Sequence, residues 1–203
     1  MQDLSSLKER QLDALREVAN IGAGHAATAL SQMVGGTIMI SVPRINIQRL
    51  EEVAPLVADP DEPVAAVLLH ILGDLSGRTL LVFPKSAALQ LAEMMLRRKA
   101  TDLGELEQSA IKEAGNILSS AYMNALSEFM GMLLLPSPPA LAIDMSAAVL
   151  TTAYLQFGSN HDYVFCVESD FMLKDAAQRL RGFFLLLPDP ASLQAILRAI
   201  RVT

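Results

Sequence analysis

Residues 12–33 read LDALREVANIGAGHAATALSQM, and the polar residues of this stretch recur later in the chain at the same spacing. Each later residue lies 96 positions after its counterpart, as residue 109 lies after residue 13. Four pairs carry the match: Asp13 with Ser109, Glu17 with Glu113, Asn20 with Asn116, and Pro43 with Pro139. The chain therefore contains a duplicated unit.

Helical periodicity predicts how this unit folds. Apolar or small residues recur at steps of three and four, which predicts one buried face of a long helix; they are Leu15, Ala19, Gly22, Ala26, Ala29, Leu30 and Met33. On another face, steps of four, three and four join Asp13, Glu17, Asn20 and Gly24. Glu17 and Asn20 therefore present a carboxylate and a carboxamide side by side, roughly 5–6 Å apart at Cβ. The second unit repeats this pair as Glu113 and Asn116.

A solvated helix face is the ordinary explanation for a Glu and an Asn on one helix. Asn is, however, a mediocre helix former on a scale that spans about 0.7 kcal/mol. The chain places Asn in mid-helix twice, each time three residues after Glu and directly before Ile. This recurrence favours a functional role over a solvated surface.

The composition describes a core-rich globular protein, because 52% of the 203 residues are hydrophobic and only 19% are charged. The net charge of −6 and the absence of Trp argue against a nucleic-acid partner. The single cysteine, Cys166, excludes an internal disulfide and a thiolate metal cluster. Residues 1–10 are polar, and the apolar run 130–143 is short and interrupted by prolines, so we expect a cytoplasmic protein without membrane insertion.

The rest of the chain predicts strands and shorter helices around the two long helices. We expect strands at 37–50 (interrupted at Pro43, at an edge or a bulge), 63–72, 77–84, 140–156, 162–168 and 181–188, a loop at 157–161, and helices at 85–99 and 190–201. The ends of the two halves also match, with a shift of 104 positions that pairs Pro84 with Pro188 and Ala87 with Ala191.

These elements predict an α/β fold with one domain, 1–203, made of two repeats at about 6–100 and 105–201. Each repeat reads helix-strand-strand-strand-helix, and the two repeats are related by an internal pseudo-twofold axis. We expect about six mainly antiparallel strands in one sheet, because short links join successive strands. The two long helices lie side by side, and each shows its Glu/Asn face to solvent.

Few kinds of chemistry are compatible with the Glu/Asn pair. The chain has no glycine-rich phosphate loop and no cluster of His, Cys and carboxylates with metal-ligand spacing. A carboxylate and a carboxamide without a nucleophile suit the placing of a water in line with a phosphoryl group that another molecule supplies. The amide both donates and accepts hydrogen bonds, whereas the carboxylate would repel phosphate and is better used against a cation of the partner.

The motif Asp13-x₃-Glu17-x₂-Asn20 followed by Pro43, and its copy Ser109-x₃-Glu113-x₂-Asn116 followed by Pro139, resembles that of the CheC-type chemotaxis phosphatases, the CheC/CheX/FliY family. The resemblance covers the whole chain. It implies a hydrolase of two-component signalling that removes the phosphoryl group from the aspartyl phosphate of the chemotaxis response regulator CheY. The resemblance further implies that Asn20 and Asn116 orient the hydrolytic water, and that Glu17 and Glu113 engage a lysine of the regulator's active site.

The resemblance also implies partners and the absence of a cofactor in this chain, since the Mg²⁺ ion belongs to the regulator. A second expected partner is the receptor deamidase CheD. The alternative is a non-catalytic interaction module of the same fold. Such a module would act in the flagellar switch, like the middle domain of FliM, which lacks the Glu/Asn motif, or it would regulate CheD.

Overall fold

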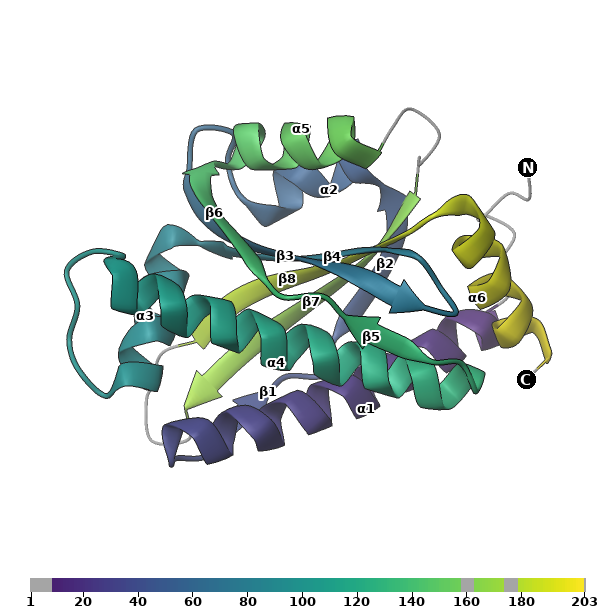
Figure 1. The fold of residues 1–203 in the computed structure, drawn as a ribbon, viewed down its shortest axis with the longest axis horizontal. Helices are drawn as coiled ribbons and strands as arrows, with labels where there is room; N and C mark the ends of the chain where they lie inside the picture. The colour runs from purple at the N-terminus through teal and green to yellow at the C-terminus, as the bar shows by residue number, and fades with distance from the viewer. Residues whose placement is uncertain (1–8, 158–162, 174–178, 203) are drawn as a thin grey trace.

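The computed structural model of the chain describes residues 9–157, 163–173 and 179–202. One β-sheet lies between helices on both of its faces (Figure 1). The same series of elements, α-β-β-α-β-β-α, occurs twice. In chain order the elements are α1 (Glu9–Val34), β1 (Ile38–Ile40), β2 (Arg44–Arg49), α2 (Leu50–Val57), β3 (Pro63–Gly73), β4 (Gly77–Pro84), α3 (Lys85–Leu96), α4 (Glu105–Met130), β5 (Leu134–Pro136), β6 (Ala140–Met145), α5 (Ser146–Phe157), β7 (Tyr163–Leu173), β8 (Arg179–Pro188) and α6 (Pro190–Val202).

The described strands form one antiparallel sheet of eight strands in the order β1-β7-β8-β4-β3-β5. Strand β2 continues the pairing of β1 with β7, and β6 continues the pairing of β5 with β3. The eight strands therefore occupy six positions across the sheet. The predicted α/β domain with about six mainly antiparallel strands is confirmed.

The two halves of the chain exchange their outer strands. Strands β1 and β2 pair with β7 of the second half, and β5 and β6 pair with β3 of the first half. At the centre of the sheet β4 pairs with β8. Neither half forms its share of the sheet alone, which explains why the chain is one domain. The residue boundaries of the two repeats stay a prediction.

Alternation of side chains along the strands supplies a separate core on each face of the sheet. On one face α1 and α4 cover the larger core, which contains Leu30, Phe83, Ile111 and Leu118. The opposite face carries a smaller core under α2 and α5, with Val53, Val82 and Leu185. Figure 1 shows α1 and α4 side by side and running in opposite directions, as predicted for the two long helices.

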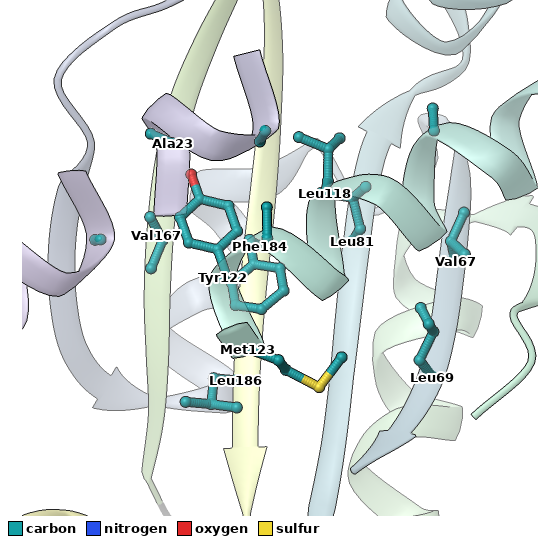
Figure 2. Close-up of a cluster of buried hydrophobic side chains, with 14 of the residues drawn as sticks. Ala23, Val67, Leu69, Leu81, Leu118, Tyr122, Met123, Val167, Phe184 and Leu186 are labelled. Atoms are coloured by element: carbon teal, nitrogen blue, oxygen red, sulfur yellow. The ribbon is translucent and has the colours of Figure 1, made fainter. Parts of the chain in front are cut away.

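Close contacts fix the two long helices on the sheet and on each other. The ring of Tyr122 on α4 stacks on Phe184 of β8 with 4.6 Å between ring centroids (Figure 2). A Cβ on Gly22 of α1 would lie 2.6 Å from Cδ1 of Tyr122, and one on Gly115 of α4 would lie 2.6 Å from Cγ1 of Val67. Glycine at these positions therefore permits α1 to approach α4, and α4 to approach β3.

The expectation of one strand at 140–156 is wrong. Strand β6 ends at Met145, and Ser146–Phe157 forms helix α5. The β-branched residues of this segment favour a strand locally, but Val149, Leu150 and Ala153 are buried at helical spacing on the smaller core. Helix α2 was not predicted, and residues 158–161 of the predicted loop lie outside the described residues.

The matching shift of 104 positions at the ends of the halves is also wrong. Helix α3 begins at Lys85 and α6 begins at Pro190, which is a shift of 105. Ala87 is buried whereas Ala191 is exposed. The buried face of the two helices follows a shift of 105, because Ala87, Leu91 and Ala92 of α3 correspond to Ser192, Ile196 and Leu197 of α6, and all six are buried.

Candidate active site

Helix α1 carries the first Glu/Asn pair on the side that faces away from the sheet. Asp13 and Glu17 are exposed, and Asn20 is half-buried. Gly24 is also exposed, and no atom lies within 4 Å of the position that a Cβ would take there. The surface beside the pair is therefore open to a visiting molecule.

Helix α4 repeats this arrangement. Ser109 and Glu113 are exposed, and Asn116 and Ser120 are half-buried. Both helices have 26 residues, so the motif occupies the same turns in each. The expectation that each long helix shows its Glu/Asn face to solvent is confirmed for the Glu residues, and the Asn residues lie at the border of that face.

The apolar face predicted for α1 packs on the sheet and on α4, with two exceptions. Leu15, Ala19, Gly22, Ala26 and Leu30 are buried as expected. Met33 is 42% exposed and Ala29 is half-buried, because the last turns of the helix extend towards the edge strand β1, where fewer elements cover them.

The Glu and Asn side chains of the two motifs have no partner in the part of the chain that the structure describes. Within the described residues, none of the side chains of Glu17, Asn20, Glu113 and Asn116 makes a hydrogen bond or an ion pair. Asn20 and Asn116 are half-buried, where polar groups normally have partners, so their unpaired carboxamides are available to a second molecule, as are the two exposed carboxylates. This availability is the feature that distinguishes the motif from a structural network.

The first position of the motif differs between the repeats. Nη1 of Arg16 lies 2.7 Å from Oδ1 of Asp13 in an exposed ion pair on α1. The equivalent residues on α4 are Lys112 and Ser109, which cannot form this pair. Exposed pairs of this kind contribute at most about 1 kcal/mol, so the difference alters the local charge of the site more than the stability of the helix.

The two motif prolines lie in the links between the short edge strands. Pro43 is buried between β1 and β2, and Pro139 is half-buried between β5 and β6. The prediction that Pro43 lies at an edge or a bulge is confirmed. Proline is tolerated there because it has no N–H to donate to a sheet ladder.

Two serines that the sequence motifs did not include hold these links. The N–H of Ser41 donates to the carbonyl oxygen of Asp170 (2.9 Å), and the N–H of Asp170 donates to Oγ of Ser41 (3.0 Å). Ser137 makes the same two contacts with His70, at 3.0 and 2.9 Å. Ser137 lies 96 positions after Ser41. The same shift that identified the other motif residues could therefore have identified this pair of serines.

In the described part of the chain, the side chains that could bind a metal ion lie apart from one another. This part contains no group of three or more His, Cys, Asp and Glu side chains that could hold a metal ion. Every helix within it is too short or too polar to cross a bilayer.

Comparisons with known proteins agree with this geometry. The profile of the CheC-like family matches residues 11–47 and 106–143, the two segments that contain the complete motifs. The CheY-P phosphatase CheC of Bacillus subtilis (strain 168) is 31% identical over 205 residues, which cover 98% of each chain. The flagellar motor switch phosphatase FliY of the same organism is 30% identical over 145 residues, covering 70% of this chain and 38% of FliY.

Solved structures share the fold at lower sequence identity. Thermotoga maritima FliY superposes with a TM-score of 0.80 at 23% identity, covering 97% of this chain and 98% of that one. The FliM middle domain from H. pylori superposes with a TM-score of 0.68 at 14% identity, covering 95% and 99%. These two likenesses concern the fold alone. With a relative 31% identical along almost its whole length, and with both motif segments matched, the chain belongs to the CheC-like family.

Proposed function

We propose that this protein is a phosphatase that hydrolyses the aspartyl phosphate of the chemotaxis response regulator CheY. One observation carries the proposal: the Glu/Asn pair occurs twice on exposed helix faces and has no partner among the described residues. The near full-length similarity to a CheY-P phosphatase supports the choice of substrate.

In this proposal Asn20 and Asn116 each orient one water molecule. The carboxamide oxygen accepts a hydrogen bond from the water, and the carboxamide N–H donates to a phosphoryl oxygen. The water oxygen attacks phosphorus while the bond from phosphorus to the regulator's aspartate oxygen breaks. The products are inorganic phosphate and the free aspartate. Because phosphoryl transfer needs positioning and charge stabilisation more than covalent help, an amide suffices.

Glu17 and Glu113 have a different task in the same proposal. Each would pair with a lysine of the regulator, which draws the regulator onto the helix and keeps the carboxylate away from the phosphoryl group. The exposure of both Glu residues supports this role, because a long cationic side chain can reach them without moving the helix. We assign no cofactor to this chain and place the Mg²⁺ ion on the regulator.

A second partner and the cellular location complete the proposal. On the family resemblance alone, we propose that the receptor deamidase CheD binds this protein and that both proteins act in the cytoplasm. Deamidase activity measured with and without this chain tests the partnership. A rate that does not change, together with no binding in a titration, would contradict it.

The phosphatase proposal is tested by adding a small molar fraction of this protein to phosphorylated CheY and following the release of phosphate. We expect each molecule of the protein to release many molecules of phosphate. Binding to the regulator in a fixed ratio without faster phosphate release would instead favour the non-catalytic interaction module. The likeness to FliM does not decide between these outcomes, because it shows the fold alone.

A further inference from the structure

A β-bulge separates the two edge strands in each half of the molecule. Ile40 pairs with Phe171 and Arg44 pairs with Glu168, so residues 41–43 lie opposite only two residues of β7. The second half has the same bulge, because Pro136 pairs with Ile71 and Ala140 pairs with Leu68. Bulges of this kind are frequent beside active sites, where they change the direction of a side chain. We call residues 41–43 the first link and residues 137–139 the second link.

Both links are held at their two ends. Ser41 and Ser137 each exchange a pair of hydrogen bonds with the neighbouring strand, through Asp170 and His70 respectively. Proline closes each link, and Pro43 is buried against the body of the protein. The middle residue of each link is therefore fixed in position while its side chain is left outside the sheet.

The middle residue is apolar and exposed in both links. Val42 is 77% exposed, more than any other large hydrophobic residue of the described part of the chain. Pro138 occupies the same place in the second link and is also exposed. A single exposed apolar residue is normal on a protein surface. Here the exposure recurs in both halves, in a link that is fixed by the same serine contacts.

The first link lies beside the part of α1 that carries the motif. At one end of the neighbouring strand pair, the N–H of Ile38 donates to Oγ of Ser31 on α1 (2.8 Å). At the other end, Ile45 lines a small apolar cavity of about 50 Å³ together with Leu15 and Ala19 of α1. The link connects these two contact points, and Asn20 lies between them on α1. Along the axis of α1, the first link therefore lies level with the segment between Ala19 and Ser31, which contains Asn20.

We propose that Val42 and Pro138 are docking residues that make an apolar contact with the response regulator at the first and second site, respectively. The inference rests on the proposed phosphatase function. It adds a contact whose position is set by the bulge, so that the regulator is held at a fixed place relative to Asn20 or Asn116. A fixed apolar contact contributes to binding with little loss of backbone freedom, because hydrogen bonds already hold the link.

Each contact is tested in a protein that has only one working site. In the Asn116→Ala background, Val42→Ser should raise the KM for phosphorylated regulator roughly tenfold and leave kcat unchanged, because uniform binding is lost. Val42→Ile should retain the original KM. Met39→Ser is the matched control, since Met39 is 47% exposed on the adjoining strand β1 and precedes the link. Pro138→Ala in the Asn20→Ala background tests the second link in the same way.

The outcomes separate this inference from the proposed function. An unchanged KM in Val42→Ser, or an equal rise in Met39→Ser, would overturn the contact while leaving the phosphatase intact. A lower thermal unfolding midpoint in Val42→Ser would assign the residue a structural role and also overturn it. If the unsubstituted protein released no phosphate, the proposed function would fail, and the docking contact would fail with it.

Discussion

At the scale of single residues, two glycines on α1 lie two positions apart in very different surroundings. Gly22 faces Tyr122 of α4, whereas Gly24 faces open space in the candidate site. The first glycine is needed for helix packing, and the second leaves room for a visiting molecule. This contrast gives a matched pair of substitutions in one helix.

Gly22→Ala should lower the free energy of unfolding by about 1–3 kcal/mol, because the new methyl group overlaps Tyr122. Gly24→Ala should raise the free energy of unfolding by up to about 1 kcal/mol, because alanine is the better helix former and nothing obstructs it. Urea unfolding of the two variants measures both changes. Equal stabilities would contradict the close approach of α1 to α4.

The single cysteine supplies a second prediction at this scale. Cys166 is 1% exposed on β7, and burial, with a smaller contribution from Glu168, raises the pKa of its thiol to about 12. The thiolate is the reactive form of cysteine, so the folded protein should not react with a disulfide reagent at about pH 8. Rapid labelling of the native protein would show that β7 is not packed as described.

At the scale of elements, Asp189 fastens the start of α6 to the turn between β3 and β4. Its Oδ1 accepts a hydrogen bond from the N–H of Ser192 (2.7 Å), and its Oδ2 accepts one from Oγ of Ser76. The N–H of Ser76 in turn donates to Oγ of Ser192 (2.8 Å). Two elements that are far apart in the chain are therefore joined by one helix cap.

Asp189→Ala should lower the free energy of unfolding at neutral pH by about 1 kcal/mol, the usual effect of losing a helix cap. Partial burial raises the pKa of Asp189, but hydrogen bonds from Ser76, Ser192 and Ala191 outweigh it, so the pKa lies below the ordinary 3.8. Stability from such a group is complete above the ordinary pKa and is lost as the pH falls through the lowered one.

The difference between Asp189→Ala and the wild type should therefore shrink only in acid. Asp189→Asn is the control, because asparagine also caps helices but does not titrate. Unfolding curves over a range of pH measure the difference. A difference that stayed constant through the acid range would contradict the lowered pKa.

The prediction of elements from the sequence succeeded where the periodicity was long and failed where it was short. Helices α1 and α4 have 26 residues each and were evident from their spacing. Helix α2 has only eight residues and contains Pro55, which disfavours a helix locally. Helix α5 carries β-branched residues, which favour a strand locally. Both short helices form because the exposed apolar face of the sheet needs cover, which is a tertiary effect.

At the scale of the whole molecule, the exchange of outer strands makes the two halves depend on each other. Strand β7 pairs with β1 and β2 of the first half, and β3 pairs with β5 and β6 of the second half. We therefore expect one cooperative unfolding transition. Circular dichroism and the exposure of Cys166 should report the same midpoint in urea. Two separate transitions would contradict the exchange.

The candidate site was visible in the sequence because duplication placed the same polar residues at one fixed shift. The structure adds three facts: both Glu residues are exposed, neither pair has a partner among the described residues, and two serines fix the links between the edge strands. The roles of Ser41 and Ser137 depend on contacts with strands more than 60 residues away, and no local pattern predicts such contacts.

The central claim is that Asn20 and Asn116 each direct water onto the phosphoryl group of the regulator. The most direct test is the rate of phosphate release from phosphorylated CheY. The rate is measured with the wild type, the two single Asn→Ala variants and the double variant. Asn124→Ala is the control, because Asn124 is an exposed residue of α4 outside the motif. We predict that each single variant keeps the activity of its other site, that Asn124→Ala matches the wild type, and that the double variant loses about 100-fold or more. A double variant as fast as the wild type would contradict the account.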